Sequence, residues 1–257
     1  MAESRLKPLP RSDCPARSGR PRSQCDRARS AQQELRRGAG LLCFFQPSFR
    51  PCRLRGTLRG MPRPSCPRCQ RPLRHCLCAL IPELHSRTRV LILQHPSEVG
   101  HALNTARLAA LGLRNAELRV GEVFEDLPQL LAQPDYRACL LFPGEESVAL
   151  SAYAPADKPL LLVVPDGTWR KARKLLYLNP VLAALPRVSL GTVAPSRYRL
   201  RKAPQEGALS TIEAIAAALD VLEAPQRFDA LLRPFDVLIE GQIAAMGQDV
   251  FIRNHQR

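Results

Sequence analysis

The chain has 257 residues, of which 45% are hydrophobic, so it can bury one substantial core with a small accessory module but hardly two large domains. Its formal net charge of +15 favours an acidic partner such as nucleic acid. No apolar run reaches the roughly 18 to 20 residues that cross a bilayer, and the first sixty residues contain no signal-peptide pattern. We therefore expect no membrane partner and a cytoplasmic protein whose nine cysteines stay reduced.

The leading segment, residues 1–60, carries most of the positive charge, with fourteen Lys and Arg against four acidic residues. It is rich in Arg, Pro, Ser and Gly and has no helical or strand period, which predicts a disordered basic extension. Two interpretations of it stay open. Either Met61 is the natural start and the segment is a translated upstream region outside the natural protein, or the segment is a basic arm that contacts RNA.

Four cysteines stand within thirteen residues in a Cys-x2-Cys-x6-Cys-x-Cys pattern: Cys66, Cys69, Cys76 and Cys78. A Cys-x2-Cys turn brings two sulfurs onto one ion and the second pair completes a tetrahedral shell, as in structural zinc sites. Four thiolates leave no open position for water or for His75. We predict a zinc-binding motif over residues 61–84, which stabilises a segment too short for its own core. Four cysteines without metal are the alternative.

From residue 85 onward, short apolar runs alternate with helical periods, which predicts a mainly parallel sheet flanked by helices. The expected strands and helices are, in chain order, strand 89–94, helix 104–113, strand 139–142, strand 160–164, helix 210–222 and helix 228–246. Ser210 and Glu213 have the spacing of a capping box. We expect the last helix to be interrupted near Pro234 and Cys139 to lie in the core.

Residues 163–179 contain the strongest candidate for a site. A strand that ends at Pro165 is expected to pass into a loop with Asp166, Thr168 and the only tryptophan, Trp169, and then into a basic helix. Ligands bind at such loops, at the carboxyl ends of parallel strands. The alternative is that Asp166 or Thr168 only caps the helix, that Trp169 packs in the core and that the charges form a solvated face.

The sequence Asp166-Gly167-Thr168-Trp169 matches the D-x-T-W signature of the DTW-domain family. Other landmarks resemble that family in the same order: the four cysteines, Gln94-His95-Pro96-x-Glu98, Leu-Phe-Pro-Gly at 141–144, Ser-Arg-Tyr-Arg-Leu-Arg-Lys at 196–202 and Leu-Ser-Thr-x-Glu-Ala at 209–214. The resemblance covers roughly residues 66–246, and nothing before Met61 is similar to the family.

The resemblance implies a SPOUT-like knotted α/β fold over residues 85–257 and a specific reaction. A protein of this kind is a tRNA-uridine aminocarboxypropyltransferase, which transfers the 3-amino-3-carboxypropyl group of S-adenosylmethionine to N3 of a tRNA uridine, expected in the variable loop, and releases methylthioadenosine. We expect a monomer or weak homodimer. An S-adenosylmethionine-dependent methyltransferase and a noncatalytic zinc-containing RNA-binding module remain as rivals.

The same resemblance distributes roles among the candidate site residues. The catalytic set is Asp166, as general base, with Thr168 and Trp169. The S-adenosylmethionine set is Leu141, Phe142, Pro143, Gly144, Asp166, Leu209, Ser210 and Thr211. The tRNA and uridine set is Arg170, Lys171, Arg173, Lys174, Ser196, Tyr198, Arg201 and Lys202, with Arg197 and Arg199 on phosphates. His95, just after a strand, either faces the site or, as the favoured interpretation, is a hydrogen-bonded structural residue.

Overall fold

A computed structural model describes residues 64–153, 157–200 and 207–255, all within one unit, Arg59–Arg257. The extension predicted over residues 1–60 lies outside the described residues, and so do Arg201 and Lys202. No helix among the described residues is both long and apolar enough to cross a membrane.

Six strands form one sheet in which every neighbouring pair is parallel, in the order β2-β1-β5-β3-β6-β4. The strands are β1 (Arg89–Gln94), β2 (Ala116–Val120), β3 (Arg137–Leu141), β4 (Val148–Ala149), β5 (Leu160–Asp166) and β6 (Arg187–Ser189). β5 lies between β1 and β3, so three segments far apart in the sequence end side by side. The predicted mixed α/β architecture with a parallel sheet is confirmed.

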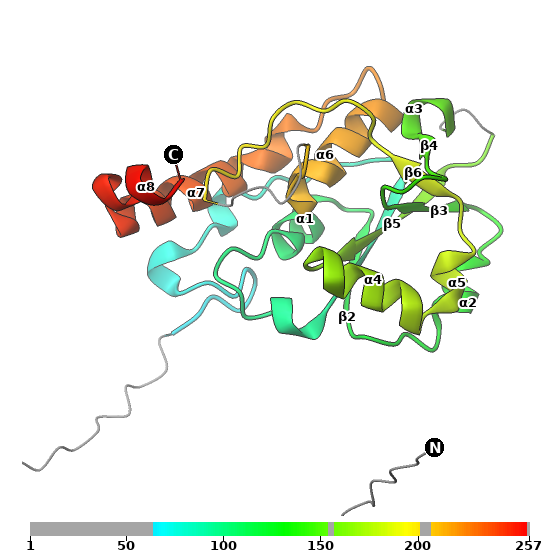
Figure 1. Ribbon diagram of the computed structural model, residues 1–257, viewed down its shortest axis with the longest axis horizontal. Helices are drawn as coiled ribbons and strands as arrows, with labels where there is room; N and C mark the ends of the chain where they lie inside the picture. Colours follow the sequence, from blue (N-terminus) through cyan, green and yellow to red (C-terminus); the bar gives the residue numbers. More distant parts are fainter. Residues whose placement is uncertain (1–63, 154–156, 201–206, 256–257) are drawn as a thin grey trace, which may run out of the picture. The chain divides into compact units, whose positions relative to one another are not determined.

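Helices cover both faces of this sheet (Figure 1). They are α1 (Ala106–Gly112), α2 (Leu127–Leu131), α3 (Leu150–Tyr153), α4 (Trp169–Leu178), α5 (Pro180–Ala183), α6 (Thr211–Leu222), α7 (Arg233–Met246) and α8 (Gln248–His255). Within the described residues, 3-10 turns occur at Leu73–His75, Cys78–Leu80, Pro96–Glu98 and Asp229–Leu232. Side chains of α1, α6 and α7 form one core cluster, and those of α2, α4 and α5 form the other.

The apolar runs of the central strands serve both clusters because successive side chains of a strand point to opposite faces. In β1, Val90 and Ile92 pack in the cluster with α1 and α6, whereas Leu91 and Leu93 pack in the cluster with α4. All four are fully buried. Runs without polar alternation therefore mark strands that are covered on both sides.

Most predicted elements appear, with small shifts in their ends. The strand at 89–94 matches β1, and the helix at 210–222 matches α6, whose capping box between Ser210 and Glu213 is confirmed. Cys139 lies in the core as predicted, and burial raises the pKa of its thiol to about 12.

The closing helix differs from the prediction. Residues 229–232 form a 3-10 turn and α7 begins only at Arg233. Pro234 lies in the first turn of α7, where its missing N–H leaves no hydrogen bond unmade. The interruption expected near Pro234 is therefore the boundary between the two helical segments.

Candidate functional site

The candidate site lies where the carboxyl ends of β1, β5 and β3 meet at one edge of the sheet. Gln94 is the last residue of β1 and Asp166 is the last residue of β5. The prediction that β5 ends at Pro165 and that Asp166 belongs to a loop is wrong. Asp166 pairs with Gln94 across the sheet, and its carbonyl accepts a hydrogen bond from the His95 N–H at 3.0 Å. The carboxylate is therefore mounted on rigid sheet backbone.

The carboxylate of Asp166 is held by two donors and is 8% exposed. The Gln94 amide donates to Oδ2 at 2.7 Å, and the Thr211 hydroxyl at the start of α6 donates to Oδ1. Burial raises the pKa of Asp166, while the bonds from Thr211 and Gln94 oppose that rise by favouring the charged form. The result is a buried, oriented carboxylate with more basicity than a surface aspartate.

The other signature residues shape the turn between β5 and α4. Thr168 caps α4, because its hydroxyl accepts a hydrogen bond from the Lys171 N–H at 3.4 Å. Trp169 is half-buried and packs edge-to-face on Phe142, with 5.6 Å between ring centroids. Gly167 has φ +155, and a Cβ there would lie 3.0 Å from Cβ of Lys171, so the close approach of strand and helix requires glycine.

Two cavities open beside this turn. The larger cavity has a volume of about 720 Å³ and is lined by the 141–144 turn, Trp169 and residues 189–193 and 207–209. The smaller cavity, about 330 Å³, is lined by Asp166 and by residues of the 98–105 segment. Gly167 and Thr211 line both cavities. Two ligands could therefore be held side by side, with the carboxylate of Asp166 at the smaller one.

The structure brings most predicted cofactor residues together. Leu141, Phe142, Pro143, Gly144, Leu209 and Thr211 all line the larger cavity. Ser210 and Asp166 line the smaller cavity instead. The backbone N–H and hydroxyl of Ser210 donate to the carboxylate of Glu213, at 2.9 and 2.6 Å, so these donors serve the capping box.

Glu213 also anchors the segment that carries Ser196 and Tyr198. Its carboxylate accepts hydrogen bonds from the Ser196 hydroxyl at 2.9 Å and from the Arg197 N–H at 2.6 Å. Tyr198 lines the smaller cavity and packs edge-to-face on Phe235 of α7. Of this pair, Tyr198 is therefore placed to touch a ligand, whereas Ser196 fastens the segment to α6.

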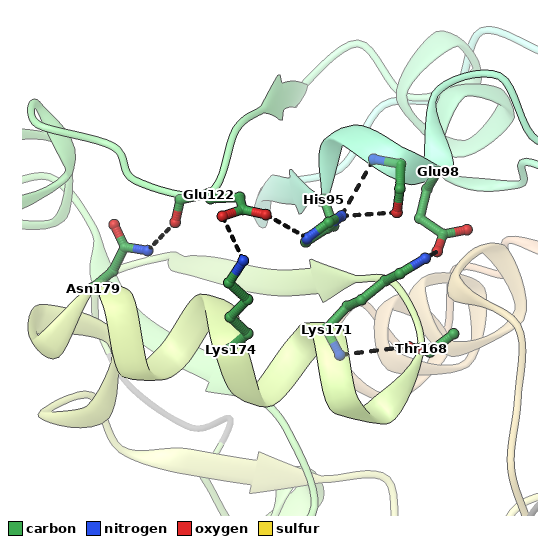
Figure 2. A network of polar contacts seen from close by, with 8 residues as sticks. His95, Glu98, Glu122, Thr168, Lys171, Lys174 and Asn179 are labelled. Atoms are coloured by element: carbon green, nitrogen blue, oxygen red, sulfur yellow. Dashed lines mark hydrogen bonds and ion pairs between the residues drawn. The ribbon is translucent and has the colours of Figure 1, made fainter. Parts of the chain in front are cut away.

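The lysines of α4 are ion-paired. Lys171 contacts Glu98 and Lys174 contacts Glu122, each at 2.7 Å, and Figure 2 shows both side chains reaching from α4 toward these carboxylates. The imidazole of His95 lies beside them, with Nε2 2.8 Å from Glu122 (Figure 2).

The Nδ1 atom of His95 accepts the Ser97 N–H at 3.2 Å, which leaves the ring proton on Nε2, toward Glu122. The histidine therefore has hydrogen-bond partners at both ring nitrogens, as the sequence predicts. His95 therefore connects the end of β1 to Glu122, the carboxylate that also pairs with Lys174.

The remaining arginines fall into two groups. Arg197 pairs with Asp236 at 3.0 Å, and Arg199 pairs with Glu240, both on α7. Arg170 and Arg173 are exposed on α4 and form no ion pair within the described part of the chain. Of these four arginines, Arg170 and Arg173 are the pair without an acidic partner among the described residues.

The four cysteines of the predicted zinc motif converge. Their sulfurs lie within 4.8 Å of one another, with 3.6 Å between Cys66 and Cys78 and 3.8 Å between Cys69 and Cys76. Four sulfurs about 2.3 Å from a tetrahedral ion stand about 3.8 Å apart, so the geometry fits zinc. Backbone hydrogen bonds at Cys69 and Arg68 lower the pKa of the Cys66 thiol to about 6, whereas burial raises the pKa of the neighbouring Cys78 thiol to about 12, so the fit to zinc rests on the sulfur positions.

Comparisons with known proteins match most of the described chain to one family. Residues 63–243 match the DTW domain. The chain belongs to the DTW domain family. A Drosophila melanogaster protein named tRNA-uridine aminocarboxypropyltransferase 2 is 33% identical over 210 residues, which span 76% of this chain and 83% of that protein. A Macaca fascicularis protein of the same name is 33% identical over 204 residues, 75% of this chain and 68% of that protein. An Arabidopsis thaliana protein named tRNA-uridine aminocarboxypropyltransferase A is 30% identical over 193 residues, 63% of this chain and 73% of that protein. No solved structure matches.

In this DTW domain, sequence reasoning missed the residues that support the aspartate. The sequence predicts Gln94 only as the end of a strand and a family landmark, and Asn104 only as the start of a helix, yet their side chains form hydrogen bonds beside Asp166. One signal was present. A glutamine that ends an otherwise apolar buried strand needs a polar partner, because an unpaired buried amide is costly.

Proposed function

We propose that this DTW-family chain is a tRNA-uridine aminocarboxypropyltransferase that transfers the 3-amino-3-carboxypropyl group of S-adenosylmethionine to N3 of a tRNA uridine in the variable loop. The observation that carries this proposal is a buried, oriented carboxylate, Asp166, which lines the smaller of two cavities that share Gly167 and Thr211. The relatives that carry the same activity in their names support the choice of reaction.

The larger cavity suits S-adenosylmethionine. Its volume of about 720 Å³ lies in the range of about 300–1,000 Å³ typical of small-molecule sites. Phe142 and Trp169 offer aromatic surface for a purine ring, and the Pro143-Gly144 turn lets backbone approach the ligand closely. When bound, S-adenosylmethionine supplies a sulfonium whose carbon substituents are open to nucleophilic attack.

The smaller cavity then takes the uridine. Uridine N3 is a weak nucleophile while it carries its proton, so a base must remove that proton. Asp166 accepts the proton, while Gln94 and Thr211 hold the two carboxylate oxygens in place. The N3–carbon bond forms as the carbon–sulfur bond breaks, and the bonding electrons neutralise the sulfonium to give methylthioadenosine. The position of N3 relative to the donor selects the aminocarboxypropyl carbon over the methyl carbon.

The basic surface binds the tRNA backbone. Arg170 and Arg173 contact phosphates directly, because their charge is not committed to an acidic partner within the described residues. Lys171, Lys174, Arg197 and Arg199 contribute less, because each already holds a carboxylate. Tyr198 orients the uridine. Arg201 and Lys202, outside the described residues, keep their predicted role toward the carboxylate or phosphate.

The rest of the predicted organisation completes this proposal. Cys66, Cys69, Cys76 and Cys78 hold a structural zinc in a motif over residues 61–84, ahead of a catalytic domain over residues 85–257. A SPOUT-like knot is proposed from the family resemblance, and the segments after β3, after β6 and before α6 line the larger cavity. An experimental structure traced through residues 201–206 tests the threading. We further propose a cytoplasmic enzyme that acts as a monomer or weak homodimer.

The decisive experiment uses purified protein, folded tRNA and S-adenosylmethionine labelled in its methyl group. The proposal predicts 3-(3-amino-3-carboxypropyl)uridine by nucleoside mass spectrometry, with the label recovered in methylthioadenosine. Label in the RNA would instead identify a methyltransferase. Binding of tRNA without binding of S-adenosylmethionine would identify a noncatalytic RNA-binding protein.

A further inference from the structure

We propose that Arg71, within the four-cysteine segment, is a positioning residue for the reaction, which acts through Asn104 and Gln94 to place Asp166 and the wall of the smaller cavity. This inference rests on the proposed function and assigns a role to the cysteine segment beyond local stability. It predicts that the zinc motif and the reacting carboxylate are parts of one hydrogen-bonded assembly.

The first step is the contact that Arg71 makes outside its own segment. Its side chain is buried, with the residue 9% exposed, and it donates from Nη1 to the Ala102 carbonyl at 2.6 Å and from Nη2 to the Asn104 carbonyl at 2.9 Å. Its Nε is buried and has no hydrogen-bond partner within the described residues, so the hydrogen bonds given for the head group are those to the two carbonyls. A planar fork on two carbonyls fixes the 102–104 backbone in direction as well as distance.

The second step is the attachment of Arg71 to the cysteine cluster. Arg71 follows Cys69 by two residues, and its carbonyl accepts the Cys66 N–H at 2.8 Å. Gln70 between them has φ 58 and donates its N–H to the Cys66 carbonyl at 2.8 Å. The turn that presents two cysteine sulfurs therefore also fixes the base of the arginine side chain.

The third step leads from the 102–104 backbone to the reacting group. The side chain of Asn104 donates to the Glu98 carbonyl at 3.1 Å and accepts from Gln94 Nε2 at 3.2 Å. The same Gln94 nitrogen donates to Asp166 at 2.7 Å. Three side chains thus connect the cysteine turn to the carboxylate. His101, Leu103, Asn104 and Thr105 line the cavity in which the uridine is proposed to bind.

A purely structural role for the cysteine segment would not require this route. Such a segment would stabilise the fold through its buried side chains, such as Leu77 and Ile81, which belong to the core cluster with α1 and α7. Arg74 offers a matched control. It lies on the same segment, between the two cysteine pairs, but its side chain is exposed.

The test compares Arg71→Met with Arg74→Met in the full chain. For Arg71→Met we expect one zinc per chain, unchanged S-adenosylmethionine affinity and faster hydrogen–deuterium exchange at residues 101–105. We expect kcat to fall by roughly tenfold or more, because a small misplacement of reacting groups removes much of the advantage of orientation. Arg74→Met should match the wild type in exchange and in kcat.

A double variant adds a readout that a stability effect does not produce. Gln94→Leu removes the link between Asn104 and Asp166, so the loss of kcat in Arg71→Met/Gln94→Leu should be no larger than in Gln94→Leu alone. A loss equal to the product of the two single losses would show that the residues act independently and would overturn the relay.

Two other results would also overturn the proposal. One is wild-type exchange at residues 101–105 together with wild-type kcat in Arg71→Met. The other is loss of zinc from both Arg71→Met and the milder Arg71→Lys, which would assign the arginine to folding of the cysteine segment. If the wild-type protein forms no modified nucleoside, the proposed function fails, while the exchange experiment still decides whether Arg71 orders the 101–105 segment.

Discussion

Carboxylates are held by hydrogen-bond donors both around the buried Asp166 and on the basic surface nearby, but the two regions differ in their exposure to water. Gln94 and Asp166 are 1% and 8% exposed, and their bond is one of a chain of direct side-chain contacts. The Arg197–Asp236 pair joins side chains that are 52% and 43% exposed. Water screens the attraction between charges at the surface, whereas a hydrogen bond in the interior is electrostatically stronger. The loss of one contact should therefore cost more at the buried site than at the surface.

This difference assigns separate tasks to the two regions. The buried contacts fix where a proton can be accepted, and they have little freedom to exchange partners. The surface lysines and arginines can exchange a carboxylate partner for a phosphate at a small cost in free energy, which suits the binding of the repeating phosphates of tRNA. The predictions below test whether the two regions separate in this way.

The largest effect is expected at Asp166. Asp166→Asn removes the base but keeps the side-chain shape, so kcat should fall by roughly 10²–10⁴-fold while S-adenosylmethionine still binds. Single-turnover rates with calorimetric binding measure both. Near-normal transfer would show that another group is the base, and lost donor binding would give Asp166 a structural role.

A large effect on stability is expected at the cysteine cluster, even though Cys76 is exposed. Cys76→Ser should release zinc and lower the unfolding midpoint by about 10 °C or more, because metal binding contributes directly to folding. Cys52→Ser, outside the cluster, is the control and should retain the metal. Metal analysis with thermal denaturation decides the outcome. Equal zinc content in both variants would mean that the four thiols do not form the site.

Much of the fold is predictable from the sequence because its signals are local. The apolar runs that become β1 and β5 contain no polar alternation, which indicates strands covered on both faces, and the Ser210–Glu213 spacing gives the start of α6. The boundary at Asp166 is not local. β5 extends to that residue because its partner strand β1 runs equally far, and a strand's partner cannot be read from its own residues.

The site shows the same division between local and nonlocal information. The signature residues stand together in the sequence, so a candidate site can be proposed from Asp166, Thr168 and Trp169 alone, although the same pattern also fits a helix cap and a packed tryptophan. Gln94, Thr211 and Arg71 meet this site only through the order of strands in the sheet. Likewise, the basic residues look equivalent in sequence, and only the positions of acidic partners on other elements separate Lys171 from Arg173.

A moderate effect with a defined direction in pH is expected at Thr211. Catalysis needs the ionised form of Asp166, and burial raises the pKa of this group. The value of kcat/KM should therefore rise with pH, and the midpoint of this rise should lie above the pKa of an ordinary aspartate. Thr211→Val removes a donor that favours the charged form, so this midpoint should move to higher pH. Thr211→Ser keeps the hydroxyl and should retain the wild-type profile. A shift to lower pH in the valine variant would contradict the role of this bond.

The smallest effects per residue are expected on the surface, where the comparison is between two arginine pairs. Arg170→Ala/Arg173→Ala should weaken tRNA binding. The negative slope of log affinity against log salt should become less steep by roughly two, one for each lost phosphate contact. Arg197→Ala/Arg199→Ala should change the slope by less than one, because these arginines are paired with Asp236 and Glu240. Both double variants should retain the wild-type kcat at saturating tRNA, since neither touches Asp166. Equal slopes for the two variants would show that tRNA opens the ion pairs on α7, and the division of the basic surface proposed here would not hold.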